Sequence, residues 1–125
     1  MKKPLIMLIL GLLCCNISLA DITVSDYLKF REGKNKKVNE FIDNNILGIG
    51  TGIFWSNINI GLKLGKANKE KPIYCAPEKL TITKENYINF LDAEIKEHKK
   101  MRVLSGDTPI AIMILFHLER IFPCK

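Results

Sequence analysis

This sequence has few of the residues from which metal and catalytic sites are made. It contains two histidines, His98 and His117, and four cysteines, two of which lie in an apolar segment near the N-terminus. The other two, Cys75 and Cys124, are far apart and have no close-spaced ligand beside them, whereas a structural metal site needs four ligands. We therefore expect neither a metal nor any other cofactor.

The sequence also lacks a nucleic-acid-binding pattern and an evident catalytic nucleophile, which narrows the range of possible functions. The lysines are dispersed among glutamates and form no basic patch interleaved with aromatic residues, which is the pattern of single-strand nucleic-acid binders. Nucleophilic catalysis by cysteine needs a free thiolate, and an exported cysteine pair is expected to be oxidised. His117 lies in an apolar run and His98 near the end of a helix, where structural roles are expected. We predict a protein that is not an enzyme and does not bind nucleic acid.

The N-terminus has the pattern of a secretory signal peptide. Lys2 and Lys3 precede an apolar run at residues 5–13, which is too short for a transmembrane helix. Residues 18–20, Ser-Leu-Ala, supply the small side chains of a cleavage site. Cleavage after residue 20 leaves one domain of residues 21–125, not attached to the membrane, and lowers the formal charge from +6 to +4.

A lipidated form stays open as an alternative at this stage. Cys14 and Cys15 follow the apolar run, where a lipoprotein would carry its acylated cysteine. Lipid attachment wants a small residue before that cysteine, however, and Leu13 stands before Cys14. Simple cleavage is the reading that we prefer.

The periodicity of apolar residues predicts an all-α domain of four helices, with a fifth left open. Thr23 or Ser25 caps the first helix, and Gly33 ends it. The third helix begins at Thr81 or Thr83, since either threonine can cap it.

The predicted second helix runs from Val38 to about residue 61 or 65. Residues 55–64 also alternate like a strand, so its end is left open. Gly48 and Gly52 share one face, where another helix can approach closely, either within the core or in a homodimer. The Gly-Ile-Gly-Thr-Gly run does not have the spacing of a nucleotide-binding loop.

The two C-terminal helices differ in polarity. The third carries an apolar stripe and is expected to turn its charged residues, Glu94 among them, to water. The stripe consists of Tyr87, Leu91, Ile95 and His98. The fourth is expected to begin at an Asp107 or Thr108 cap with Pro109 in its first turn, and it is apolar on nearly every side, which predicts a buried helix.

An exported chain with two distant cysteines predicts one disulfide, Cys75–Cys124. The bond would close a loop of 50 residues, counting both ends. The chain-entropy estimate for such a loop is about 4 kcal/mol, a large share of the stability of a small domain.

The residues around these cysteines resemble a known family. Residues 74–77 (Tyr-Cys-Ala-Pro), then Leu80 and Thr81, an amphipathic helix, and an apolar helix ending at residues 122–124 (Phe-Pro-Cys) are similar to the Rap/Tai-type immunity proteins. The glycine-bearing helix at residues 41–54 also resembles the first long helix of that family. The second cysteine pair that family members often carry near the first two helices is missing here.

The resemblance implies an exported, all-helical protein of the Gram-negative periplasm. It implies that the partner is a peptidoglycan amidase effector delivered by a type VI secretion system, whose active site the immunity protein occludes without any chemistry of its own. The alternative from another class is an HdeA-like acid-stress chaperone, a small periplasmic helical protein that loosens at low pH. A secreted cationic toxin is a third class, for which no catalytic set or membrane-active helix stands out.

The connector between the third and fourth helices, residues 98–107, is the first candidate for the partner-binding surface. It is basic and lies between two helices that packing would hold in place. The residues expected to contact the partner are Lys99, Lys100, Met101, Arg102, Leu104, Ser105 and Asp107. Residues 66–72, a charged loop beside the predicted disulfide, are the second candidate, and an ordinary helix connector remains the alternative for the first.

Overall fold

The computed structural model describes residues 21–64, 72–77 and 80–125, and within these ranges the chain is helical with no β-strand. The helices are α2 (Val24–Glu32), α3 (Lys36–Leu64), α4 (Lys84–Met101) and α5 (Ile110–Ile121). The all-α architecture predicted from the sequence is confirmed, with four helices among the described residues. None of these helices is long and apolar enough to cross a membrane.

Threonine capping boxes begin both α2 and α4. The hydroxyl oxygen of Thr23 accepts the backbone N–H of Asp26, whose carboxylate accepts the N–H of Thr23 in return. Thr83 and Asn86 form the same reciprocal pair at α4. At each helix the sequence offered two candidate caps. The structure uses the one that is followed three residues later by an Asp or Asn acceptor, because only that spacing closes the box.

α3 is one continuous helix of 29 residues, so residues 55–64 are helical and not extended. It begins earlier than the predicted Val38 because the side-chain oxygen of Asn35 accepts the N–H groups of Lys37 and Val38, at 3.1 and 3.3 Å. These bonds satisfy donors that have no partner within the first turn. At a rise of about 1.5 Å per residue, α3 is about 43 Å long.

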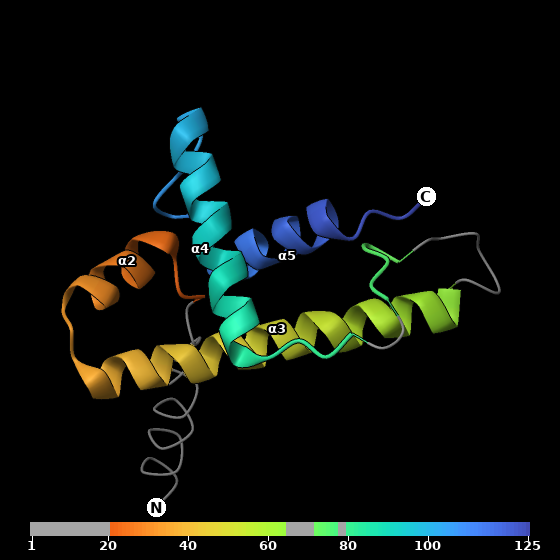
Figure 1. The fold of residues 1–125 in the computed structure, drawn as a ribbon, viewed down its shortest axis with the longest axis horizontal. Helices are drawn as coiled ribbons and strands as arrows, with labels where there is room; N and C mark the ends of the chain where they lie inside the picture. Colours follow the sequence, from red (N-terminus) through yellow and green to blue (C-terminus); the bar gives the residue numbers. More distant parts are fainter. Residues whose placement is uncertain (1–20, 65–71, 78–79) are drawn as a thin grey trace, which may run out of the picture.

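α3 forms the base of the molecule, and the other three helices lie on one side of it (Figure 1). α4 rises steeply from the middle of α3, α5 crosses α4, and α2 lies beside the N-terminal half of α3. The predicted burial of the α4 stripe is confirmed at Tyr87, Leu91 and Ile95. The prediction that α5 is buried on nearly every side is wrong: only one side of it packs on the core, and Ile112 and Phe116 on the other side are exposed. The core side chains are Val24, Tyr27, Ile42, Ile46, Tyr74, Tyr87, Leu91, Ile95, Ile110, Met113, Ile114 and Leu118.

Close packing of α4 against α3 takes place at Gly50. A Cβ atom at this position would lie 2.5 Å from three ring carbons of Tyr87, so the ring fills the space that a side chain would need. At Gly48 and Gly52, in contrast, nothing in the described structure lies within 4 Å of the place of a Cβ atom. Of the two alternatives left open for Gly48 and Gly52, close packing inside the fold is therefore wrong for the described residues, because α3 turns the opposite face to the core.

α5 begins without the side-chain cap that was predicted at Asp107 or Thr108. Its N-cap residue is Pro109, and no side chain bonds to the first turn. The N–H of Ile110 instead donates to the carbonyl oxygen of Ile22 at 2.9 Å, within a short backbone bridge to the segment that precedes α2. A tertiary contact thus replaces the local cap and joins the beginning of α5 to the beginning of α2.

The Gly50–Tyr87 contact predicts that alanine substitutions at two glycines of α3 have opposite effects on stability. Gly50→Ala should lower the free energy of unfolding by about 1–3 kcal/mol, because the methyl group collides with the Tyr87 ring. Gly52→Ala should raise it by up to about 1 kcal/mol, because alanine favours the helix and meets nothing there. Denaturant unfolding followed by circular dichroism measures both changes, and equal stability of the two variants would contradict the packing described here.

Candidate partner-binding site

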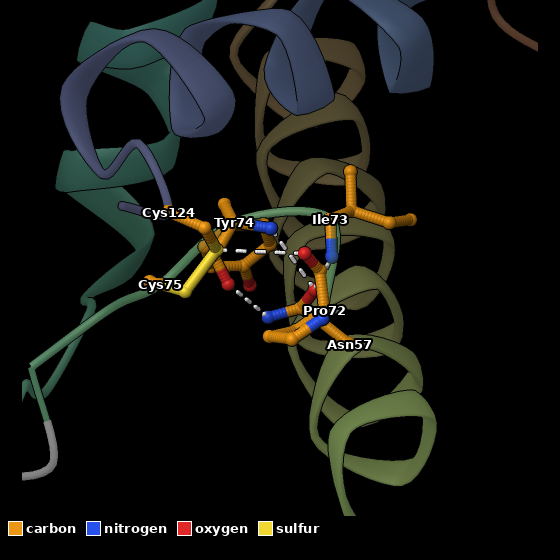
Figure 2. Close-up of a disulfide and its surroundings, with 6 residues drawn as sticks. All are labelled: Asn57, Pro72, Ile73, Tyr74, Cys75 and Cys124. Carbon is orange, nitrogen blue, oxygen red and sulfur yellow. Dashed lines mark hydrogen bonds between the residues drawn. A yellow bond between two sulfur atoms is a disulfide. The ribbon is translucent and has the colours of Figure 1, made fainter. Parts of the chain in front are cut away.

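The predicted disulfide between Cys75 and Cys124 is confirmed, with the two Cα atoms 4.9 Å apart. It joins the segment that follows α3 to the residues that follow α5 (Figure 2). Beside it, the backbone N–H of Cys75 donates to the carbonyl oxygen of Phe122 at 2.8 Å. The covalent bond and the hydrogen bond together hold the C-terminal end of the chain on residues 72–77.

Asn57 of α3 holds the same segment from the other side (Figure 2). Its amide nitrogen donates to the carbonyl oxygen of Tyr74 at 2.8 Å. Its side-chain oxygen accepts the N–H groups of Ile73 and Tyr74, at 2.8 and 3.2 Å. Asn57 is buried, so its side chain replaces water as the partner of backbone groups that would otherwise be unsatisfied. The sequence carried a signal for this role, an asparagine within an apolar helical stripe.

The connector between α4 and α5 lies at the end of α4 that is farthest from α3 (Figure 1). Three of its predicted contact residues, Lys99, Lys100 and Met101, belong to the last turn of α4. Arg102 follows in the left-handed conformation, with φ of 56°, and its N–H bonds back to the carbonyl oxygens of α4. The turn at Arg102 ends the helix and reverses the chain.

The second half of the connector is fixed against α2. The N–H of Ser25 donates to the carbonyl oxygen of Gly106 at 2.9 Å. Ser105 and Asp107 lie in the turn next to this contact, where the N–H of Asp107 donates to the Ser105 hydroxyl at 3.4 Å. Leu104 is half-buried and packs against the core. Leu104, Ser105 and Asp107, three of the seven residues selected from the sequence, are therefore held in place by contacts with the rest of the fold.

The segment of residues 99–103, at the end of α4, is called the tip below. Met101 and Val103 are its exposed apolar residues. Their exposed fractions are 53% and 62%, which makes Val103 more accessible than either apolar residue of the sequence-based selection. Val103 was not in that selection; an apolar residue two positions after Met101 in a polar connector is the signal that would have found it. A shallow groove beside the tip adds positive charge and is lined by Leu28, Asp92, Ile95, Lys96, Lys99 and Lys100.

The second candidate, residues 66–72, lies outside the described residues apart from Pro72. Pro72 is half-buried, and a Cβ atom at Gly61 would lie in ordinary contact with its ring at 3.8 Å. The carbonyl oxygen of Pro72 lies 3.5 Å from the sulfur of Cys124. This end of the segment therefore belongs to the disulfide junction.

Glu94 is buried, so the prediction that it faces water is wrong. One carboxylate oxygen lies 3.0 Å from the Nδ1 atom of His117 and accepts a hydrogen bond of 2.6 Å from the guanidinium of Arg120. The other lies 3.4 Å from the Nδ1 atom of His98. Glu94 shares the face of Leu91, since residues three apart on a helix are neighbours, and this spacing was the signal for its burial.

The Glu94 cluster links α4 to α5 electrostatically. Burial alone would raise the pKa of Glu94, but the hydrogen bonds and charges of Arg120 and His117 outweigh it and hold this pKa below its ordinary value. His117 is a buried, hydrogen-bonded histidine whose ring stacks on Phe90 at a centroid distance of 4.8 Å, as expected of a structural residue. In the described part of the chain, no three His, Cys, Asp or Glu side chains are grouped so that they could hold a metal ion.

Comparison with known proteins adds no relative: no family model, no curated protein and no solved structure matches the chain.

Removal of the Asn57 side chain should release the disulfide segment from α3. Asn57→Ala leaves the N–H of Ile73 and the backbone of Tyr74 without their partner, which should cost about 2–3 kcal/mol in the free energy of unfolding. Asn59→Ala, at an exposed position of the same helix, is the matched control and should change it by less than about 0.5 kcal/mol. Hydrogen exchange should show faster exchange at residues 73 and 74 in the first variant only.

The lowered pKa of Glu94 predicts a loss of stability in acid. A carboxylate whose pKa is lower in the folded state stabilises the fold above its unfolded pKa of about 4.3 and loses that contribution as the pH falls through the folded value. Glu94→Gln should cost about 2 kcal/mol at neutral pH, and the difference from the wild type should shrink below pH ~4. Urea titrations across this range test it.

The control for Glu94 is Glu97→Gln on the same helix. Glu97 pairs only with Lys100, at 3.6 Å, and both side chains are about half exposed or more. Such pairs contribute about 0–1 kcal/mol, so this variant should stay close to the wild type at each pH. A Glu94→Gln variant that is as stable as the wild type at neutral pH would show that the cluster does not stabilise the fold.

Proposed function

We propose that the protein is an exported immunity protein that binds a peptidoglycan amidase effector of a type VI secretion system and occludes its active site. The resemblance around Cys75 and Cys124 suggested this function, and the observation that carries it in the structure is the fixed, exposed tip at residues 99–103. That tip presents Met101 and Val103 together with lysines, at the far end of a helix that a disulfide-bonded scaffold holds.

Rigidity supports inhibition by this tip. The connector leaves α4 through the turn at Arg102 and returns through the backbone contact of Gly106 with Ser25. Both ends are therefore held before the partner arrives. A loop that is already in its bound shape loses little conformational entropy on binding, so more of its contact energy appears as affinity.

Charge and apolar surface would have separate roles in the complex. Lys96, Lys99 and Lys100 line one groove beside the tip, which favours a partner with acidic groups near its active-site cleft. Such charges raise the rate at which the two proteins associate and fix their relative orientation. Affinity usually comes from a few central apolar anchors, and Met101 and Val103 are the candidates here.

Substitution of the two anchors tests the proposal. Met101→Ala combined with Val103→Ala should weaken binding to a peptidoglycan amidase encoded beside this gene by about 30-fold or more, the size expected of hot-spot residues. Ile112→Ala is the matched control, because Ile112 is also an exposed apolar residue but lies on α5. Calorimetry gives the affinities, and an assay of peptidoglycan cleavage gives the inhibition.

The outcomes separate the proposal from its alternatives. Tight inhibition that the double substitution leaves unchanged would retain the immunity function and refute this binding site. No interaction with the amidase would refute the function itself. Protection of an unrelated client protein from aggregation at low pH would instead favour the acid-stress chaperone, toward which the acid sensitivity expected from Glu94 also points.

A further inference from the structure

The groove beside the tip lies between α2 and α4, and we call it the α2–α4 groove. It is lined by Leu28, Asp92, Ile95, Lys96, Lys99 and Lys100. Leu28 belongs to α2, and the other five residues belong to α4, where their spacing of one, three and four residues puts them on one face. Both helices lie on the same side of α3 (Figure 1). From Asp92 to Lys100, at about 1.5 Å per residue, this face of α4 is about 12 Å long.

The deepest part of the groove is apolar. Ile95 is buried in the core and Leu28 is half-buried against it. At one end of the groove, the hydroxyl of Tyr27 donates to the carboxylate of Asp92 at 2.6 Å. This bond joins α2 to α4, so the two walls of the groove are held in place without a ligand.

Two of the three lysines of the groove lack an ion-pair partner. Lys100 lies 3.6 Å from Glu97, whereas Lys96 and Lys99 are exposed and form no ion pair with any described residue. Like charges one turn apart on a helix repel each other. The negative end of the helix dipole offsets this for Lys99, in the last turn, but Lys96 lies more than a turn from the helix end. An anionic ligand would relieve the repulsion.

The mixture of charge and apolar surface favours a peptide among the anionic ligands. Anionic membranes are bound by clusters of about 4–8 lysines or arginines, whereas this groove has three lysines and an aspartate that repels headgroups. A single small anion would leave the apolar floor in contact with water. A peptide segment supplies carboxylates for the lysines and an apolar side chain for the floor. Since an extended chain rises about 3.3 Å per residue, about four residues fill the groove.

We propose that the α2–α4 groove binds a short acidic segment of the partner protein. Two carboxylates of the segment engage Lys96 and Lys99, and one apolar side chain packs on Leu28 and Ile95. The groove is thus a second contact beside the tip, and it holds a chain segment that lies outside the active site of the partner. The inference rests on the proposed function for the identity of the partner, but not for the chemistry of the ligand. Two contacts on one rigid scaffold strengthen each other, because the second forms within the complex.

A synthetic peptide tests the groove without any amidase. The acetylated and amidated peptide Asp-Glu-Phe-Asp-Glu, titrated into the isotope-labelled, disulfide-bonded protein, should shift the backbone amide signals of residues 28, 95, 96 and 99. A dissociation constant of about 1 mM is expected for so small a contact. Peptides with Asn and Gln in place of the acids, or Gly in place of Phe, should bind at least about tenfold more weakly. No shift at the groove, or equal binding of the neutral peptide, would overturn the proposal.

Charge reversal provides the matched control. Lys96→Glu combined with Lys99→Glu should abolish the shifts that the acidic peptide causes. Lys36→Glu combined with Lys37→Glu changes the net charge equally, at exposed positions where α3 begins, and should bind the peptide within about twofold of the wild type. All four side chains are exposed, so circular dichroism should be preserved in both variants. An equal loss of binding in the two variants would mean a non-specific effect of net charge and would overturn the proposal.

The amidase of the proposed function shows whether a partner uses the groove. Lys96→Glu with Lys99→Glu should slow association with it about tenfold, and the Lys36 and Lys37 pair should not. Inhibition with an unchanged association rate would retain the immunity function and refute the groove. Peptide binding without any complex with the amidase would support the groove and refute the proposed function. Co-sedimentation with phosphatidylglycerol vesicles, lost in the groove variant and without peptide binding, would assign these lysines to a membrane and overturn the proposal.

Discussion

The segment from Pro72 to Ala76 has no secondary structure of its own, and the arrangement of α3, α5 and the C-terminus depends on how it is held. Asn57 bonds its backbone on the side of α3, while the Phe122 carbonyl and the disulfide to Cys124 hold it on the side of α5. The disulfide reduces the number of conformations open to the unfolded chain. The Asn57 amide satisfies backbone groups that burial would otherwise leave unpaired.

α5 benefits most from this junction. It is only 12 residues long and has no side-chain cap, so its own helical preference is weak. The backbone bridge to Ile22 fixes its first turn, the disulfide follows its last, and the Glu94 cluster joins its C-terminal half to α4. A small domain with a thin core gains much from such bonds at the ends of its helices, because little apolar surface is available to hold them.

The sequence by itself determined what depends on neighbours along the chain. Helix existence followed from apolar periodicity, the two candidate caps at each of α2 and α4 from local hydrogen-bonding residues, and the disulfide from there being one distant cysteine pair outside the apolar N-terminal run. Only the tertiary structure decided which glycine α4 packs against. Gly48, Gly50 and Gly52 look alike in sequence, and the direction in which α3 turns its faces depends on the whole core.

Contacts between helices that are distant in the chain also explain where else the structure differs from the sequence-based predictions. Glu94 is buried because His117 and Arg120 reach it from α5, and α5 needs no side-chain cap because the segment before α2 supplies a backbone acceptor. The candidate partner-binding site likewise combines features that the sequence shows with features that only the tertiary structure decides. Its lysines and Met101 could be read from a polar connector, but the exposure of Val103 and the partial burial of Leu104 are set by packing between helices that are distant in the chain.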